Sequence, residues 1–147
     1  MKTLKTLVLT ITAAALLGST GLYAQEKAVA DIPFAFTVLG KTMPAGQYSI
    51  QQGAITHKGL LHFQNAANGE SAIVLAPASS ASYTTKDDVQ AKVIFHRYGD
   101  RYFFSEVWSA SGTLNGKVQP SKLEKETRIN AGEKQMALVT LPVSVGK

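Results

Sequence analysis

The chain contains no cysteine among its 147 residues. That absence excludes disulfides, which small exported domains often use, and it excludes a lipid anchor on an N-terminal cysteine. The chain also lacks a run of charges of one sign, because its lysines, arginines, aspartates and glutamates are scattered. Nucleic-acid binding needs clustered basic residues, so we expect no nucleic-acid partner.

Motifs for catalysis and cofactor binding are missing as well. No serine stands in a G-x-S-x-G pattern, and no glycine-rich stretch forms a phosphate-binding loop. His57 and His62 fall on one face of an expected hairpin, but spacing supplies no third ligand, and zinc sites in proteins usually have three or four. We therefore expect no metal, no cofactor and no catalytic residue set.

The N-terminus has the order of a secretory signal peptide. Two lysines within the first five residues precede an apolar run from Leu7 to Leu17, and small residues follow up to Ala24. The apolar run of about eleven residues is too short for a bilayer core, which needs ~20, so a retained membrane anchor is disfavoured. We expect cleavage after Ala24, with a second possible site at 28–30, and a periplasmic or extracellular protein without a stable transmembrane segment. Residues 1–24 are then the signal peptide and 25–147 a single β-rich domain.

Short runs of β-branched and aromatic residues recur between turn signals in residues 25–147. This pattern is typical of antiparallel all-β proteins. The expected strands are 32–38, 47–51, 54–57, 60–65, 71–76, 91–98, 101–109 and 135–145. The predicted fold is all-β, a single antiparallel barrel or sandwich of seven to eight strands, with one short helix before the last strand.

The helix is predicted from its ends. Ser121 and Glu124 form a capping-box pattern, in which the serine caps the helix and the glutamate reaches back to it. Gly132 closes the segment, since glycine commonly follows a helix C-terminus. Apolar residues are sparse between these ends, so a mostly solvated helix lying over the sheet is expected.

The clearest hairpin turns at Gly99-Asp100. Counting outward from a two-residue loop pairs Arg97 with Tyr102, Phe95 with Phe104, Val93 with Glu106, and Ala91 with Trp108 on one face. That face is aromatic, and Arg97 can make a cation–π contact with Tyr102. Glu106 falls among apolar neighbours, so it either emerges at a rim or pairs with a cation from another strand, the latter being favoured. The candidate binding residues are Arg97, Tyr102, Glu106 and Trp108.

Several blocks resemble a known family. They are Ile32–Val38, Met43–Tyr48 and Phe95–Phe103, followed by Gln119-Pro120-Ser121-Lys122 and a charged helix. In this order they are similar to a family of small secreted bacterial proteins, abundant in acidobacteria, that has no assigned activity. The resemblance spans nearly the whole of residues 25–147. It implies export and one domain, and it transfers no site residue.

Three functional hypotheses follow. The first is an exported, non-catalytic binding or envelope-associated module whose partner is a small ligand or an envelope protein. The second is a structural or assembly protein that pairs with a partner through an edge strand, with 135–145 as the candidate. The third is a small hydrolase or isomerase that uses Glu106, His96 or Asp100 as acid or base.

Overall fold

The computed structural model describes residues 26–53, 59–77, 90–112, 114–132 and 136–146. Within these ranges the chain forms eleven strands and one helix. The strands are β1 (Lys27–Ile32), β2 (Phe36–Val38), β3 (Lys41–Met43), β4 (Gly46–Gln52), β5 (Leu60–Asn65), β6 (Ser71–Leu75), β7 (Lys92–Tyr98), β8 (Arg101–Trp108), β9 (Gly116–Lys117), β10 (Met136–Pro142) and β11 (Ser144–Gly146). The helix is α1 (Lys122–Ala131), and the expected strand 54–57 lies outside the described residues.

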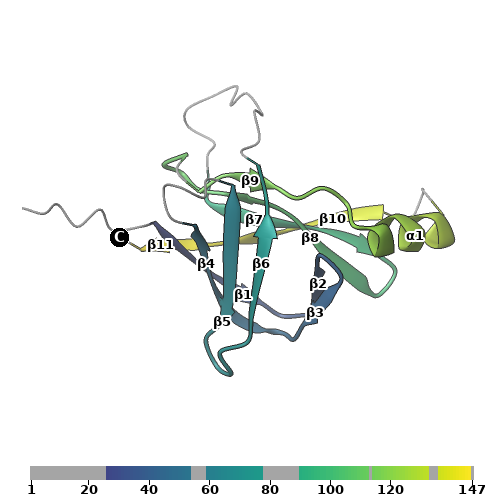
Figure 1. Cartoon of the computed structure of the whole chain (residues 1–147), viewed down its shortest axis with the longest axis horizontal. Coiled ribbons are helices and arrows are strands. Elements are labelled where there is room, and N and C mark those ends of the chain that lie inside the picture. The colour runs from purple at the N-terminus through teal and green to yellow at the C-terminus, as the bar shows by residue number, and fades with distance from the viewer. Residues whose placement is uncertain (1–25, 54–58, 78–89, 113, 133–135, 147) are drawn as a thin grey trace, which may run out of the picture.

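The strands form a sandwich of two sheets whose strands cross each other in projection (Figure 1). The first sheet has the order β11-β1-β4-β5-β6, and the second has the order β10-β7-β8-β2-β3, with β9 paired to β8. This confirms an all-β sandwich with a short helix before the last strands and decides against a closed barrel. The purely antiparallel prediction needs one correction, because β2 runs parallel to β8.

The chain crosses between the sheets at two prolines, which raises the strand count above the predicted seven to eight. No strand is predicted before Ile32, yet β1 covers Lys27–Ile32 in the first sheet. It ends before Pro33, which has no backbone N–H for a ladder, and β2 begins after it in the second sheet. The expected strand 135–145 divides after Pro142, where β10 of the second sheet gives way to β11 of the first. The short strands β3 and β9 complete the set.

The core lies between the two sheets and is rich in aromatic rings. Phe36 packs edge-on against Tyr48 and Phe95, with ring centroids 5.1 and 5.3 Å apart, and Phe63 packs against Phe104 at 4.6 Å. Edge-to-face pairs at such distances add to the stabilisation that burial gives. The fully buried residues Ala28, Ala30 and Ile32 of β1 belong to the same core.

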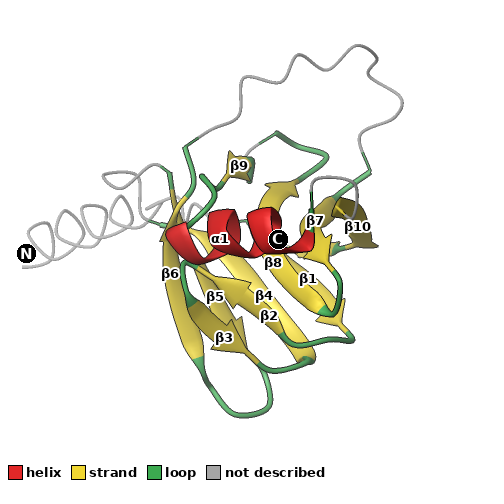
Figure 2. Ribbon diagram, turned by 90° about the vertical axis from the view of Figure 1, so that its right-hand side faces the viewer, coloured by secondary structure: helices red, strands yellow, loops and turns green. Residues whose placement is uncertain are grey.

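Helix α1 lies at one end of the molecule (Figures 1 and 2). Its predicted ends are confirmed: Ser121 Oγ accepts the N–H of Glu124 at 3.2 Å, and Gly132 follows the last turn with φ of 74°. The side chain of Glu124, however, is turned to the second sheet instead of back to the cap. The buried residues of the helix are the polar Glu124 and Thr127, whereas Ile129 is exposed.

Candidate functional site

The β7–β8 hairpin follows the predicted register only next to its turn. The pairs there are Arg97 with Tyr102, His96 with Phe103, and Phe95 with Phe104. Ser105 is then left without a partner in β7, as in a β-bulge. Glu106 consequently lies opposite Ile94 instead of Val93. The predicted pairing of Glu106 with Val93 is therefore wrong, because the bulge directs the Glu106 side chain to the opposite face of the sheet.

The bulge divides the four candidate binding residues between the two faces of the second sheet. Arg97 and Tyr102 stand on the core side, at its end beside the turn, while Glu106 and Trp108 stand on the outer side. The four side chains therefore do not form one surface. The predicted register places Trp108 on the same face as Phe95 and Tyr102; it is buried, but against the outer side of the sheet. A role in binding for these residues stays a prediction.

Arg97 and Tyr102 close one end of the core. The Arg97 guanidinium carbon lies 5.5 Å from the centre of the Tyr102 ring, which confirms the predicted cation–π contact. The ring of Phe34 stacks on the ring of Tyr102. The two ring centroids are 3.8 Å apart, and the angle between the ring planes is only 14°. Arg97 Nε also donates to the carbonyl of Gly99 at 2.7 Å, which holds its side chain over the turn.

Glu106 forms the ion pair that its sequence position suggested. Its Oε1 lies 2.8 Å from Nζ of Lys117, the residue directly opposite it in β9, and its Oε2 accepts from Nε1 of Trp108 at 3.0 Å. Both carboxylate oxygens are thus engaged, and they fix β9 and the indole on the outer side of β8. These contacts give Glu106 a structural role, because neither carboxylate oxygen remains without a partner for acid–base chemistry.

His96 and Glu124 meet beneath α1. His96 Nδ1 lies 2.7 Å from Glu124 Oε1, and the Tyr98 hydroxyl donates to the same oxygen at 3.3 Å. Glu124 is only 5% exposed. Burial, followed by the charge of Glu124, raises the pKa of the Tyr98 hydroxyl above its ordinary value of 10.0.

The three acid–base candidates of the enzymatic hypothesis are not brought together. His96 is bound to a helix residue, Glu106 is bound to Lys117, and Asp100 lies exposed in the hairpin turn. Neither the hollow lined by Ser49 and Gln64 nor the one lined by Pro33 and Gly46 includes any of them. The enzymatic alternative therefore has no shared site for a substrate among these residues.

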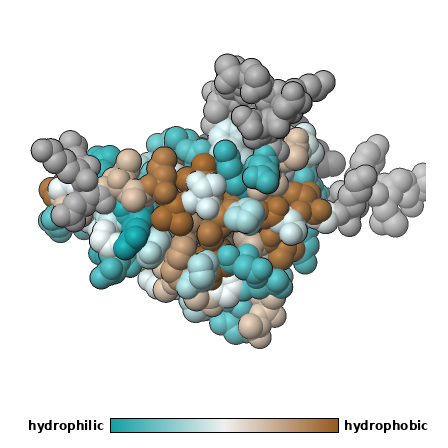
Figure 3. Space-filling model, turned by 180° about the vertical axis from the view of Figure 1, so that it is seen from behind, coloured by the Kyte–Doolittle hydropathy of each residue, from teal (hydrophilic) through white to brown (hydrophobic). Residues whose placement is uncertain are grey.

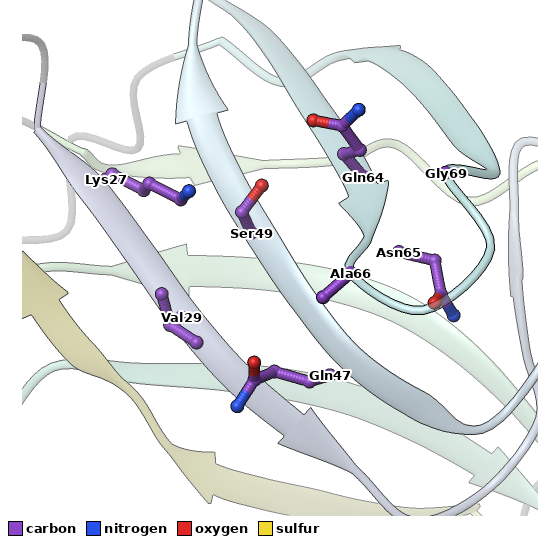
Figure 4. Close-up of a pocket in the computed structure, with 8 residues that line it drawn as sticks. All are labelled: Lys27, Val29, Gln47, Ser49, Gln64, Asn65, Ala66 and Gly69. Atoms are coloured by element: carbon purple, nitrogen blue, oxygen red, sulfur yellow. The ribbon is translucent and has the colours of Figure 1, made fainter.

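A shallow groove of about 280 Å³ lies on the outer face of the first sheet (Figure 4). Its lining comes from β1, β4, β5 and the turn after β5: Lys27, Val29, Gln47, Ser49, Gln64, Asn65, Ala66 and Gly69. This groove could not be predicted from the sequence, because each strand contributes only one or two ordinary polar residues. A second hollow borders Pro33 and Gly46 at the end of the same strands.

The edge of the second sheet is apolar and exposed. β10 reads MALVTLP, without a charged residue, and no position in it is fully buried. Leu138 is 63% exposed and Met136 is also exposed. In Figure 1, β10 runs behind the first sheet. Seen from behind, the surface shows a band of apolar side chains (Figure 3). The uncharged run is visible in the sequence, but its exposure is not.

No cluster of three or more potential metal ligands occurs within the described ranges. Of the histidines His57 and His62, which the sequence places on one face, His57 lies outside those ranges. No described helix is long and apolar enough to cross a membrane.

Comparisons of the chain with protein families, with curated proteins and with solved structures find no match.

Proposed function

We propose that the protein is an exported, non-catalytic binding module that takes up an extended segment of a partner protein along β10. The observation that carries this proposal is the uncharged, exposed edge strand of the second sheet. Natural proteins usually protect such edges with charges, bulges or a covering element, because an unpaired edge recruits further strands. β10 carries no charge along its length, which favours use of the edge for recognition.

The backbone groups of β10 alternate between facing β7 and facing away from it. Val143, just beyond the strand, donates its N–H to the carbonyl of Ala91 at 3.1 Å. In an antiparallel ladder, alternate residues direct their N–H and C=O groups to the same neighbour. Leu138 and Thr140 therefore direct theirs away from β7. Pro142 shares this outward orientation, so its missing N–H costs the β7 ladder nothing.

The side chains of β10 define the chemistry of the partner. Leu138 projects from the outer face of the sheet, whereas Val139 and Leu141 lie half-buried against the rim of the core. A partner strand with aliphatic residues on both faces and no charge over about five residues would cover them, since cross-strand apolar pairs stabilise a sheet. A charged segment would lose hydration without gaining a counterion, and we expect it to be rejected.

Export is part of this proposal and rests on the N-terminal sequence. Residues 1–24 have the order of a signal peptide, and all described strands follow them. An exported location places the edge strand among envelope or extracellular proteins, where its partner would be found.

A defined peptide tests the proposal. A nine-residue peptide of three Val-Val-Thr repeats, which carries valine on both faces of a strand, is blocked at both ends, titrated into the isotope-labelled protein and followed by NMR. We expect the amides of Leu138 and Thr140 to shift and to exchange more slowly with solvent, because they donate to the added strand. An acidic peptide of equal length should have no such effect.

A matched pair of variants locates the site. Leu138→Lys places a charge on the edge strand and should weaken peptide binding by about tenfold or more. Ile73→Lys changes an equally exposed apolar residue, 64% exposed against 63%, on β6 of the first sheet, and should leave binding unchanged. Equal losses in both variants, or a peptide response confined to other strands, would refute strand addition at β10.

A further inference from the structure

The groove on the first sheet arises from one small side chain. Val29, Ser49 and Gln64 lie directly opposite one another on β1, β4 and β5, so they form a row across three strands. Ser49 is the shortest of the three and occupies the middle, while Lys27 and Gln47 flank the row with long side chains. The hollow of about 280 Å³ lies where the longer side chains rise around the serine (Figure 4).

Some of the polar groups in this lining are already used by the fold. Gln47 Nε2 donates to Asp31 Oδ1 at 3.2 Å, and Asn65 Oδ1 accepts the N–H of Ala67 at 2.8 Å. The Lys27 ammonium, the Ser49 hydroxyl and the Gln64 amide are different. Within the part of the chain that the structure describes, none of these three has a side-chain hydrogen bond or ion pair. Figure 4 shows them around the same space.

We propose that this groove binds a small hydroxylated carboxylic acid, such as a uronic acid. Lys27 supplies the charge for a carboxylate, and none of the described lining residues is acidic and would oppose it. The Ser49 hydroxyl and the Gln64 amide each donate and accept, which suits ligand hydroxyl groups that do both. Val29 gives an apolar contact beside them.

The dimensions fit one ring and no more. Neighbouring strands lie about 4.8 Å apart, so the row across three strands spans about 10 Å. The volume of about 280 Å³ lies just below the ~300–1,000 Å³ found for ligand sites. None of the lining residues that the structure describes is aromatic, so they offer a sugar ring no stacking surface, and binding rests on the polar contacts. We expect a weak, millimolar interaction.

The test compares three probes by NMR titration: galacturonate, galactose and acetate. Galacturonate should shift the signals of Lys27, Ser49 and Gln64 saturably, and galactose or acetate should bind at least about fivefold more weakly, because each has only part of the recognised chemistry. Equal binding of galactose would show that the carboxylate is not recognised, and equal binding of acetate would show that the hydroxyls are not. Either result overturns the proposal, as does a galacturonate response outside the groove.

Two variants test the geometry. Lys27→Gln should weaken galacturonate binding by about tenfold and bring it close to galactose binding, whereas Lys122→Gln, on a side chain of α1 that is 92% exposed, should have no effect. Ser49→Leu fills the hollow and should abolish the response while the amide spectrum stays dispersed. Retention of binding in Lys27→Gln, or an equal loss in Lys122→Gln, contradicts the assignment. The outcome is separate from strand addition, which is measured at Leu138 and Thr140.

Discussion

Glu124 Oε1 lies 2.7 Å from His96 Nδ1, so the first turn of α1 is joined to the second sheet through a buried carboxylate. The helix contributes almost no apolar surface to this contact, because Ile129 faces solvent and Thr127 faces the sheet. Thr127 Oγ1 accepts from Arg101 of β8 at 3.0 Å, which adds a second polar link. The position of α1 therefore depends on specific hydrogen bonds more than on hydrophobic burial.

Replacing Glu124 should destabilise the protein more than replacing an exposed residue of the same helix. In Glu124→Ala the Tyr98 hydroxyl and the His96 ring lose their common acceptor in a largely buried site. We expect a loss of about 1–3 kcal/mol in the free energy of unfolding, measured by urea denaturation. Glu126→Ala is the control, because Glu126 is exposed and its pair with Lys122 is loose at 3.9 Å; its cost should stay below about 0.5 kcal/mol. Equal losses in the two variants would show that the buried contact contributes nothing.

Alkaline pH should weaken the fold through Tyr98. Burial and the Glu124 charge raise the pKa of its hydroxyl above 10.0, so the folded state keeps a proton that the unfolded state releases. Stability is then fully present below about pH 10 and falls as the pH rises through the higher folded pKa. Tyr98→Phe should reduce this fall. Unfolding free energies of the protein and the variant, measured at about pH 9 and pH 11, give the comparison.

The residual alkaline fall in Tyr98→Phe has its own source. Burial also raises the pKa of Tyr48, whose hydroxyl donates to the carbonyl of Pro44 at 2.6 Å. Because that group remains in the variant, some pH dependence should persist. An identical pH slope in the variant and the parent protein would contradict the assignment to Tyr98.

The features that could be predicted from the sequence are those set by neighbouring residues in the chain. The ends of α1 follow from Ser121 and Gly132, and the hairpin register next to Gly99 follows from the two-residue loop. Alternation identified β5 and β6 within a residue of their ends. Each of these features depends on residues close together in the chain, so one sequence is enough to find it.

Features set by distant contacts were missed. The bulge at Ser105 has no signature in its own residues, and it turns Glu106 to the outer face, where Lys117 of β9 pairs with it. The capping box correctly predicted the hydrogen bond from the backbone N–H of Glu124 to Ser121. The Glu124 carboxylate, however, contacts His96 instead of the start of the helix. The exposure of β10 depends on which strand ends the second sheet, and hydrophobicity alone does not reveal that order.

Gly116 should tolerate no side chain. A Cβ there would lie 2.9 Å from both the Cβ and the backbone oxygen of Ala76, and backbone cannot move aside cheaply. We expect Gly116→Ala to lower the free energy of unfolding by about 1–3 kcal/mol, as overpacking commonly does. Gly146→Ala is the control, since its nearest neighbour is 4.0 Å away, and it should stay within about 0.5 kcal/mol of the parent. A neutral Gly116→Ala in urea denaturation would mean that β9 moves freely away from Ala76.

If residues 1–24 are the proposed signal peptide, β1 limits where it can be cleaved. Ala28 and Ala30 are fully buried, and β1 is the strand that β11 pairs with in the first sheet. Cleavage after Ala30 would remove most of β1 and leave β11 without that partner, so we expect the exported protein to begin at Gln25, after Ala24. Intact-mass measurement of the protein from the exported fraction checks this, and Ala24→Arg should accumulate the uncleaved precursor, because signal cleavage needs a small residue there. An exported form that begins at Asp31, or an uncleaved protein confined to the cytoplasm, would contradict the expectation.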